Sequence, residues 1–398
     1  MHPQERARPS GLASPEQAEP PEAGPSSDAE FDAPALVSLD AIRAAAEVIR
    51  GVVVRTPLLP FGAPEDGDQS GRTRALLKPE SLQPIGAFKL RGAYYNIATL
   101  STERRAAGVV AHSSGNHAQG VARAARLLGV RAVIVMPSDA SRIKVERVQE
   151  DGAEIVFVGP SSEERAERAA ELARSEGLSM VGPYDDVATI TGQGTVGLEI
   201  VEQLAALERR AGEWTSDRRS GARSGRRSGT RDGRPDEPGP FTVLVPVGGG
   251  GIASGVAVAV KSLRPDAVVI GVEPALAADA RDSLARGRIV TWPAEMVGRT
   301  IADGQRTTQI GRIPFALMRR YLDGIVTVTE DEIVRAMVRA SRDARLVLEP
   351  SGATALAAWL FHAAELPPRG RVVVILSGGN VDPVLYDELL ARGVAAGG

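Results

Sequence analysis

The chain has 398 residues and a net charge of −3, with 43% hydrophobic and 24% charged residues, a balance typical of globular proteins. It has no cysteine, which excludes disulfides, thiolate nucleophiles and Cys-ligated zinc. No apolar run reaches the length of a membrane span, the start does not look like a signal peptide, and the charge gives no general attraction to nucleic acid. We therefore expect a cytoplasmic protein whose partners include neither membrane nor nucleic acid.

The order of strand-like and helix-like segments predicts an α/β protein with two open parallel-sheet domains. Residues 1–33 are rich in Pro, Glu, Ala and Ser, which predicts a disordered N-terminal tail. Strands and helices alternate over residues 109–186, and this stretch forms a small inserted domain in our interpretation. Residues 34–108 and 187–398 form a larger domain around it, with a helix around residues 197–210 and a capping box at Thr329–Glu332.

An insertion rich in Arg, Ser and Gly interrupts the larger domain at residues 212–240. Its composition predicts a disordered surface loop. A basic arm for nucleic acid is the alternative, which the lack of interleaved aromatic residues disfavours.

Residues 78–93 carry the most informative lysine of the chain. Pro84 and Gly86 break a short strand, and a helical pattern then places Lys89 in the first turn of a helix. The positive end of the helix dipole and a dry loop both lower the pKa of an amine there, and a neutral amine is what Schiff-base chemistry requires. The alternative is an ordinary surface lysine, although the chain has only four lysines (Lys78, Lys89, Lys144 and Lys261).

Three glycine-containing loops each follow a predicted strand: residues 112–117, 248–251 and 377–380. Ligands of open α/β sheets bind at the carboxyl ends of the strands, so we expect these loops to face one site in the cleft between the two domains. The amides of residues 248–251 would cradle a phosphate, and the loop at 113–117 would suit a carboxylate. His112 and His117 could equally be structural histidines.

The segments KPESLQPIGAFKLRGA, SSGNHAQG, GQGT at 192–195, the four glycines at 248–251 and SGGN resemble, in this order, the threonine dehydratase and serine racemase family. That family depends on pyridoxal 5'-phosphate and has the tryptophan-synthase-β-like fold, known as fold type II. The resemblance implies that Lys89 forms the Schiff base, Asn116 bonds the phenolic oxygen of the cofactor and Ser377 bonds its pyridine nitrogen. The further residues that it implies are Phe88, Gly248, Gly249, Gly250 and Gly251 for the cofactor, and Ser113, Ser114, Gly115 and His117 for the substrate.

The same resemblance implies a reaction. We expect a threonine/serine dehydratase, or ammonia-lyase, that converts L-threonine to 2-oxobutanoate and L-serine to pyruvate by β-elimination, as a homodimer or homotetramer. A hydroxyl at Ser377, in place of a carboxylate, favours elimination over transamination. Ser114 stands where many dehydratases have alanine, which leaves a serine racemase as an alternative, together with a threo-3-hydroxyaspartate ammonia-lyase. The alternatives of another class are a non-catalytic amino-acid-binding protein and a nucleic-acid-binding protein.

One segment predicts a metal site. Glu273, the carbonyl of Ala277 and Asp279 resemble the divalent-cation site of serine racemase, and such oxygen ligands suit Mg²⁺ or Ca²⁺. The alternative is that Asp279 caps a helix and Glu273 lies in an ordinary turn.

Overall fold

The computed structural model describes residues 37–62, 75–113, 115–140, 142–220, 239–367 and 370–395. The predicted N-terminal tail at 1–33, Ser114 and residues 221–238 of the predicted insertion lie outside the described residues. In the described ranges, every helix is too short or too polar to span a membrane.

The larger of two sheets has six strands in the order β1-β2-β10-β7-β8-β9. These are β1 (Leu59–Phe61), β2 (Ala75–Pro79), β7 (Phe241–Pro246), β8 (Val268–Pro274), β9 (Gly324–Val328) and β10 (Arg371–Leu376). Only the β1–β2 pair is antiparallel, and the other four pairs are parallel. The carboxyl ends of β2, β7, β8 and β10 therefore lie along one edge of the sheet.

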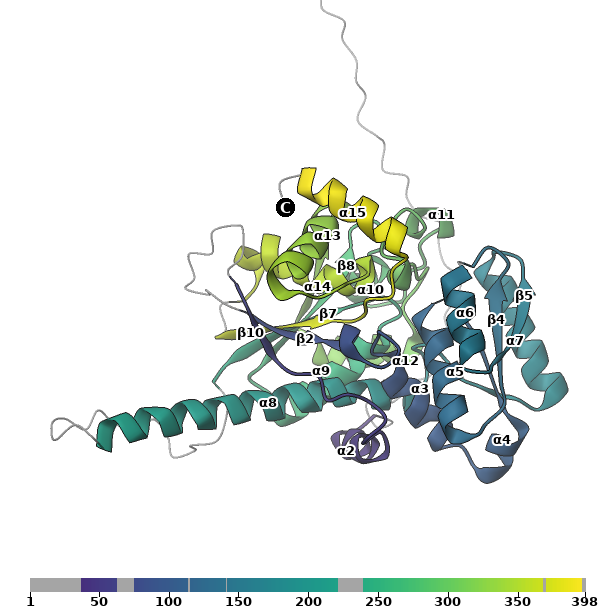
Figure 1. The fold of residues 1–398 in the computed structure, drawn as a ribbon, viewed down its shortest axis with the longest axis horizontal. Helices are drawn as coiled ribbons and strands as arrows, with labels where there is room; N and C mark the ends of the chain where they lie inside the picture. The colour runs from purple at the N-terminus through teal and green to yellow at the C-terminus, as the bar shows by residue number, and fades with distance from the viewer. Residues whose placement is uncertain are drawn as a thin grey trace, which may run out of the picture. The chain divides into compact units, whose positions relative to one another are not determined.

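Helices cover both faces of this sheet (Figure 1). Leu244 and Val374 point to the face covered by α13 (Glu330–Arg339) and α14 (Pro350–Phe361), whereas Val243 and Val373 point to the face covered by α8 (Val187–Ser220) and α9 (Gly251–Leu263). Because both faces are buried, these strands are apolar throughout, as in other parallel sheets. The remaining helices around this sheet are α2 (Leu39–Val48), α10 (Asp279–Arg286), α11 (Ala294–Val297), α12 (Arg312–Tyr321) and α15 (Pro383–Ala395).

The smaller sheet has four strands in the order β5-β4-β3-β6, all parallel. They are β3 (Val109–His112), β4 (Ala132–Pro137), β5 (Glu154–Val158) and β6 (Ser179–Met180), with helices α4 (Thr102–Ala107), α5 (Asn116–Leu128), α6 (Arg142–Glu150) and α7 (Ser162–Glu176). The parallel α/β fold predicted from the sequence is thus confirmed. The domain boundaries at 108/109 and 186/187 stay a prediction, because residues 32–398 form one compact unit by their contacts.

Helix α3 (Lys89–Ala98) lies between the two sheets and joins them. Its residues Leu90, Ala93 and Ile97 belong to the apolar core under β3 and β4, while α3 also packs on α8. Glycines allow these close approaches. A Cβ at Gly192 of α8 would lie 2.7 Å from the Cα of Gly92, so the two helices touch backbone to backbone.

A buried ion cluster, which we define as Lys78, Glu80, Arg91 and Glu199, fixes the start of α3. Arg91 Nε donates to Glu80 at 2.7 Å and its Nη1 donates to Glu199 at 2.7 Å, while Lys78 Nζ donates to Glu199 at 2.5 Å. The side chains of Lys78, Glu80 and Arg91 are fully buried and that of Glu199 nearly so. The cluster ties β2, α3 and α8 together, one helical turn from Lys89.

Two boundaries differ from the sequence-based prediction. Helix α8 begins at Val187 rather than near residue 197, and it continues to Ser220, into the segment predicted to be disordered. Residues 212–220 therefore belong to α8 in the structure, and the disorder of the insertion stays a prediction. A helix propagates cheaply once it is nucleated, so the well-packed first half of α8 extends through the polar residues that follow.

Candidate active site

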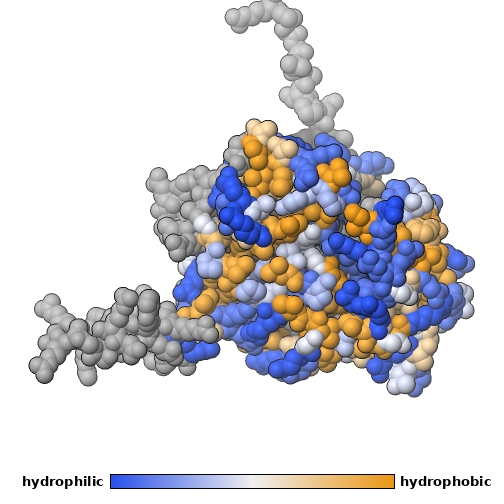
Figure 2. Space-filling view, in the orientation of Figure 1, coloured by the Kyte–Doolittle hydropathy of each residue, from blue (hydrophilic) through white to orange (hydrophobic). Residues whose placement is uncertain are grey.

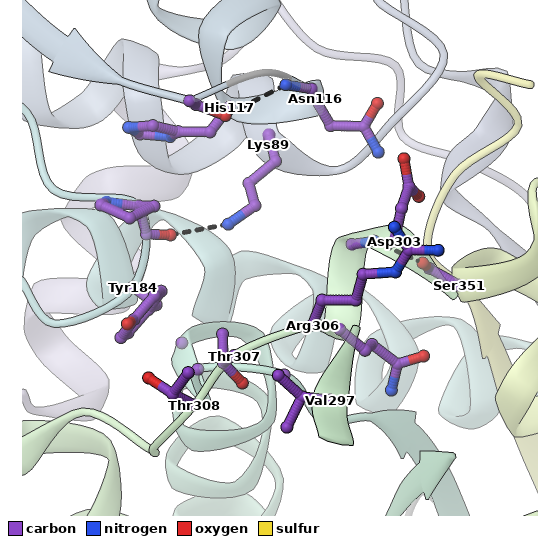
Figure 3. Close-up of a pocket in the computed structure, with 18 of the residues that line it drawn as sticks. Lys89, Asn116, His117, Tyr184, Val297, Asp303, Arg306, Thr307, Thr308 and Ser351 are labelled. Atoms are coloured by element: carbon purple, nitrogen blue, oxygen red, sulfur yellow. Dashed lines mark hydrogen bonds between the residues drawn. The ribbon is translucent and has the colours of Figure 1, made fainter. Parts of the chain in front are cut away.

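A cavity of about 690 Å³ lies where the loops after β3, β7 and β10 meet the start of α3. It is lined by all three glycine-containing loops that the sequence singled out and by Phe88 and Lys89. Figure 3 shows Lys89 pointing into this cavity, with Asn116 and His117 beside it and Tyr184, Thr307 and Thr308 further along the wall. The three loops therefore line one cavity at the carboxyl ends of the strands, and the binding role of each residue stays a prediction.

Lys89 is the first residue of α3, and its half-buried side chain lines the cavity. The Nζ atom donates a hydrogen bond to the carbonyl of Pro183 at 2.7 Å and lies 5.2 Å from the centre of the Phe88 ring. Burial lowers the pKa of Lys89 from 10.5 to about 8, because the charged form is poorly solvated there. A substantial neutral fraction near physiological pH makes this amine a candidate nucleophile and base.

The four glycines after β7, predicted to form an anion cradle, line the cavity at the start of α9. Gly250 has φ +91°, a left-handed conformation that favours glycine. A Cβ at Gly249 would lie 2.2 Å from the ring of Tyr184, so a side chain at this position would clash with the ring. Bare amides at a helix N-terminus fit a phosphate group.

Asn116 is the first residue of α5 and faces the cavity. Its Nδ2 donates to Glu349 at 2.6 Å, and its Oδ1 accepts from the Nδ2 of Asn380 at 2.8 Å. Burial, followed by the charge of Asp303, raises the pKa of Glu349 to about 8, against the opposing effect of the Asn116 hydrogen bond. Glu349 is therefore mostly a neutral acid at pH 7.

The loop before α5 has a defined hydrogen-bond pattern. Ser113 Oγ accepts from the amide of Gly115 at 3.2 Å, and Gly115 precedes the first turn of α5. His117 lines the cavity, but its Nε2 lies 2.8 Å from the carbonyl of Val181. Burial, followed by the nearby Lys89, lowers the pKa of His117 to about 3, so the ring is neutral and Nε2–H is the donor.

Ser377 follows β10 and also lines the cavity, with 5% of its surface exposed. Its hydroxyl donates to the carbonyl of Ser351 at 3.3 Å. This long bond leaves the hydroxyl available to a nitrogen acceptor in the cavity.

Several cavity residues escaped the sequence-based prediction: Tyr184, Asp303, Arg306, Thr307, Thr308 and Glu349. Lys144 of α6 reaches across to Asp303 at 2.6 Å, and Arg306 Nε donates to the carbonyl of Thr300 at 2.8 Å. Tyr184 could have been found, because it follows the short strand β6 at the same sheet edge as the Ser113 loop. Glu349 gave no such signal, since it precedes a helix rather than following a strand.

The predicted cation ligands Glu273, Ala277 and Asp279 are all buried at the end of β8 and the start of α10. Glu273, rather than Asp279, caps α10: its carboxylate accepts from the amides of Ala280 at 3.1 Å and Arg281 at 2.8 Å. The alternative in which Asp279 caps the helix is therefore wrong. The Asp279 carboxyl lies near the backbone amides of Asp279 and Ile310, but neither of its oxygens accepts a hydrogen bond of normal geometry from the described residues.

Burial raises the pKa of Asp279 from 3.8 to about 7. Burial, followed by the charge of Asp279, also raises the pKa of Glu273 well above 4.5. The described part of the chain contains no group of three or more His, Cys, Asp or Glu side chains arranged for a metal. The carboxylates of Glu273 and Asp279 and the carbonyl of Ala277 nevertheless fit a hard cation that also binds water. Such a cation would give the buried Asp279 carboxyl the partner that it lacks among the described residues.

Comparison with known proteins agrees with this geometry. The model of the family described as pyridoxal-phosphate dependent enzyme matches residues 49–213 and 229–378. The L-threonine ammonia-lyase of Thermotoga maritima is 37% identical over 91% of this chain and 80% of its own length. The L-threo-3-hydroxyaspartate ammonia-lyase of Saccharomyces cerevisiae is 36% identical over 79% of this chain and 85% of its own length.

A solved structure extends the likeness to the fold. The structure of maize serine racemase superposes with a TM-score of 0.75 at 32% identity and covers 91% of this chain and 99% of that one. The resemblance drawn from the motifs is confirmed. The chain belongs to the family of pyridoxal-phosphate dependent enzymes, with threonine ammonia-lyases and serine racemases among its relatives.

Proposed function

We propose that the protein is an ammonia-lyase that uses pyridoxal 5'-phosphate to convert L-threonine to 2-oxobutanoate and ammonia, and L-serine to pyruvate and ammonia. One observation carries the proposal: the amine of Lys89, with its pKa lowered to about 8, lies in the same cavity as the glycine cradle. The names of the relatives support the substrate class.

The residues of this chain fit the cofactor. Gly248, Gly249, Gly250 and Gly251 would hold its phosphate, and Ser377 its pyridine nitrogen. Phe88, Lys89 and Asn116 would hold the rest of the ring. When bound, pyridoxal phosphate supplies an electron-withdrawing ring that makes the Cα–H bond of an amino acid acidic.

The chain supplies the remaining chemistry. The backbone amides of residues 113–115 and the hydroxyls of Ser113 and Ser114 would hold the substrate carboxylate at the N-terminus of α5, as predicted from the sequence. His117 closes the wall beside them as a neutral ring. The neutral amine of Lys89 then takes the Cα proton, the Cα electron pair forms the Cα–Cβ double bond, and the β-hydroxyl leaves as water after protonation. Hydrolysis of the released enamine returns one water and gives the 2-oxo acid and ammonia.

A second substrate is supported by a specific observation. Arg306 lines the cavity, and only its Nε has a hydrogen bond that the structure defines, to Thr300. Its remaining N–H groups could bind a second carboxylate, as in threo-3-hydroxyaspartate. Serine racemase activity rests on Ser114, whose position lies outside the described residues, so it stays a prediction.

We also propose that Glu273, the carbonyl of Ala277 and Asp279 bind Mg²⁺ or Ca²⁺. The burial of Asp279 without a closed hydrogen bond supports this site. The ion would steady the start of α10 rather than touch the substrate.

An oligomer and a cytoplasmic location complete the proposal. Exposed apolar side chains of α15 support a homodimer or homotetramer: Val384, Leu385 and Val394 are 68%, 45% and 61% exposed. Helix α15 lies at the top of Figure 1, and apolar surface is visible in the same region of Figure 2. The compartment stays a prediction.

Kinetics on four substrates test the proposal: L-threonine, L-serine, D-serine and L-threo-3-hydroxyaspartate, each assayed for 2-oxo acid and ammonia. We expect the holoenzyme to show a visible absorbance band that borohydride bleaches, and to turn over L-threonine and L-serine. A protein that binds the cofactor but turns over only the dicarboxylate would shift the function to the second candidate. A protein without the band would refute both.

A further inference from the structure

A chain of three side-chain hydrogen bonds, which we call the amide chain, runs from Arg147 through Asn380 and Asn116 to Glu349. Arg147 Nη1 donates to the Oδ1 of Asn380. Asn380 Nδ2 donates to the Oδ1 of Asn116 at 2.8 Å, and Asn116 Nδ2 donates to Glu349 at 2.6 Å. The amide chain therefore links α6 and α5, beside the smaller sheet, to the ends of loops from the larger sheet.

The direction of the amide chain is set at its first member. A guanidinium group only donates, so Arg147 must face the oxygen of Asn380, and the nitrogen of Asn380 must then face the oxygen of Asn116. A further bond from Asn380 Nδ2 to the carbonyl of Ile85 at 2.7 Å confirms this orientation. The nitrogen of Asn116 is thereby directed toward Glu349, its one acceptor among the described residues, and its second hydrogen can be donated to a group in the cavity.

Two glycines leave room for the amide chain. A Cβ at Gly86, which has φ +72°, would lie 2.5 Å from the Oδ1 of Asn380. A Cβ at Gly378 would lie 2.1 Å from the Oε1 of Glu349. These glycines belong to the lysine segment and to the SGGN loop, so both segments contribute to the placement of one amide.

We propose that Glu349 is a positioning residue, which holds the Asn116 amide so that its free N–H faces the phenolic oxygen of bound pyridoxal phosphate. This inference rests on the cofactor placement given under the proposed function. Glu349 does not itself need to touch the cofactor; it acts through Asn116. Because the Glu349 carboxyl is mostly neutral at pH 7, glutamine reproduces its shape and its acceptor oxygen.

A double-mutant cycle tests the proposal with cofactor affinity as the readout. Apoprotein is titrated with pyridoxal phosphate, followed by absorbance, for the wild type and the Glu349→Ala, Asn116→Ala and double variants. We expect Glu349→Ala to weaken affinity about fivefold in the wild-type background and to shift the visible band, but to add less than about twofold in the Asn116→Ala background. Glu349→Gln should restore affinity to within about twofold of the wild type.

Equal losses in the two backgrounds would overturn the proposal, and so would unchanged affinity and spectrum in Glu349→Ala. If Glu349→Ala does not fold, Asn380→Ala replaces it in the same cycle with Asn116→Ala. This variant removes the hydrogen bond to the oxygen of the Asn116 amide instead of the one from its nitrogen. Glu167→Ala, which removes an exposed carboxylate on α7, is the matched control and should change nothing. If the effects of the two substitutions are coupled but the protein does not turn over L-threonine, the proposed substrate is rejected. The positioning role of Glu349 is then still supported.

Discussion

Lys78 and Lys89 lie on the same segment of the chain but in opposite surroundings: Lys78 is fully buried, whereas Lys89 is half-buried in the cavity wall. Lys78 Nζ donates to Thr56, Glu199 and Gln203 within the ion cluster and its neighbours. Lys89 has a single carbonyl partner at Pro183, and burial is the one cause of its lowered pKa. Burial lowers the pKa of Lys78 as well, but the carboxylates of Glu199 and Glu80 oppose that shift. The paired amine contributes to the fold, whereas the amine without a carboxylate is left reactive.

The buried acids Glu80, Glu349 and Asp279 differ from one another in the same way. Burial alone would raise the pKa of Glu80, but Arg91 outweighs it and the pKa is lowered, so Glu80 stays ionised. Glu349 and Asp279 have no guanidinium within bonding distance in the described structure, and burial raises both of their pKa values. Buried acids with a raised pKa, such as Glu349 and Asp279, are typical of functional sites. The buried groups of the ion cluster are paired with opposite charges and serve the fold instead.

Removing Lys89 should have the largest effect. We expect Lys89→Ala to lower kcat for L-threonine by about 10³-fold or more, because the base at Cα is lost, and to abolish the borohydride-sensitive band. The melting temperature of the apoprotein should be unchanged or higher, since a buried amine without a carboxylate is removed. Lys261→Ala, which breaks a peripheral pair with Asp323, is the control. Turnover retained in Lys89→Ala would assign the role to another lysine.

Removing Lys78 should do the opposite. Lys78→Met leaves Glu199 with one buried partner fewer, and breaking a buried ion pair costs about 3 kcal/mol or more. We expect a matching fall in the free energy of unfolding by urea, while kcat per folded molecule changes less than about twofold, because Lys78 lies outside the cavity. A loss below about 1 kcal/mol, the value of an exposed pair, would contradict the structural role of the cluster.

Asp279 should give a smaller effect that depends on pH and cation. Its pKa rises from 3.8 to about 7 on folding, so its contribution to stability is present below pH 3.8 and lost as pH rises through about 7. In EDTA we expect the protein to lose about 2 kcal/mol between about pH 5 and about pH 8, and Mg²⁺ or Ca²⁺ to restore it at the higher pH. Asp279→Asn should remove the response to chelator and cation and weaken the response to pH, since the buried Glu273 still titrates. A wild-type melting curve that ignores pH, chelator and cation would exclude the cation site.

The sequence was sufficient for the parts of the site that depend on local chemistry. A strand, a glycine turn and a helix start are encoded within a few residues, and this was enough to predict that Lys89, residues 248–251 and Ser377 line one cavity. The start of α8 was missed because Thr189, Thr191, Gly192 and Gly194 are poor helix formers. Packing on α3 and α9 overrides their propensities.

The amide chain lay beyond prediction for a different reason. Asn116 and Glu349 are 233 positions apart in the chain, and Asn116 and Asn380 are 264 apart. No periodicity or turn signal links such distant side chains, and their contact exists only once both sheets are folded. The same holds for Tyr184 over the glycine cradle, which brings the end of β6 against the start of α9.

The pKa of Lys89 is the central claim, and the rate at which apoprotein combines with pyridoxal phosphate measures it most directly. Only the neutral amine attacks the aldehyde of the cofactor, so the rate should rise with pH and level off with an apparent pKa of about 8. Lys144→Ala, which removes the other cavity lysine, should leave this profile unchanged. A rate that keeps rising up to the ordinary lysine pKa of 10.5 would show that burial does not neutralise Lys89, and would contradict the account.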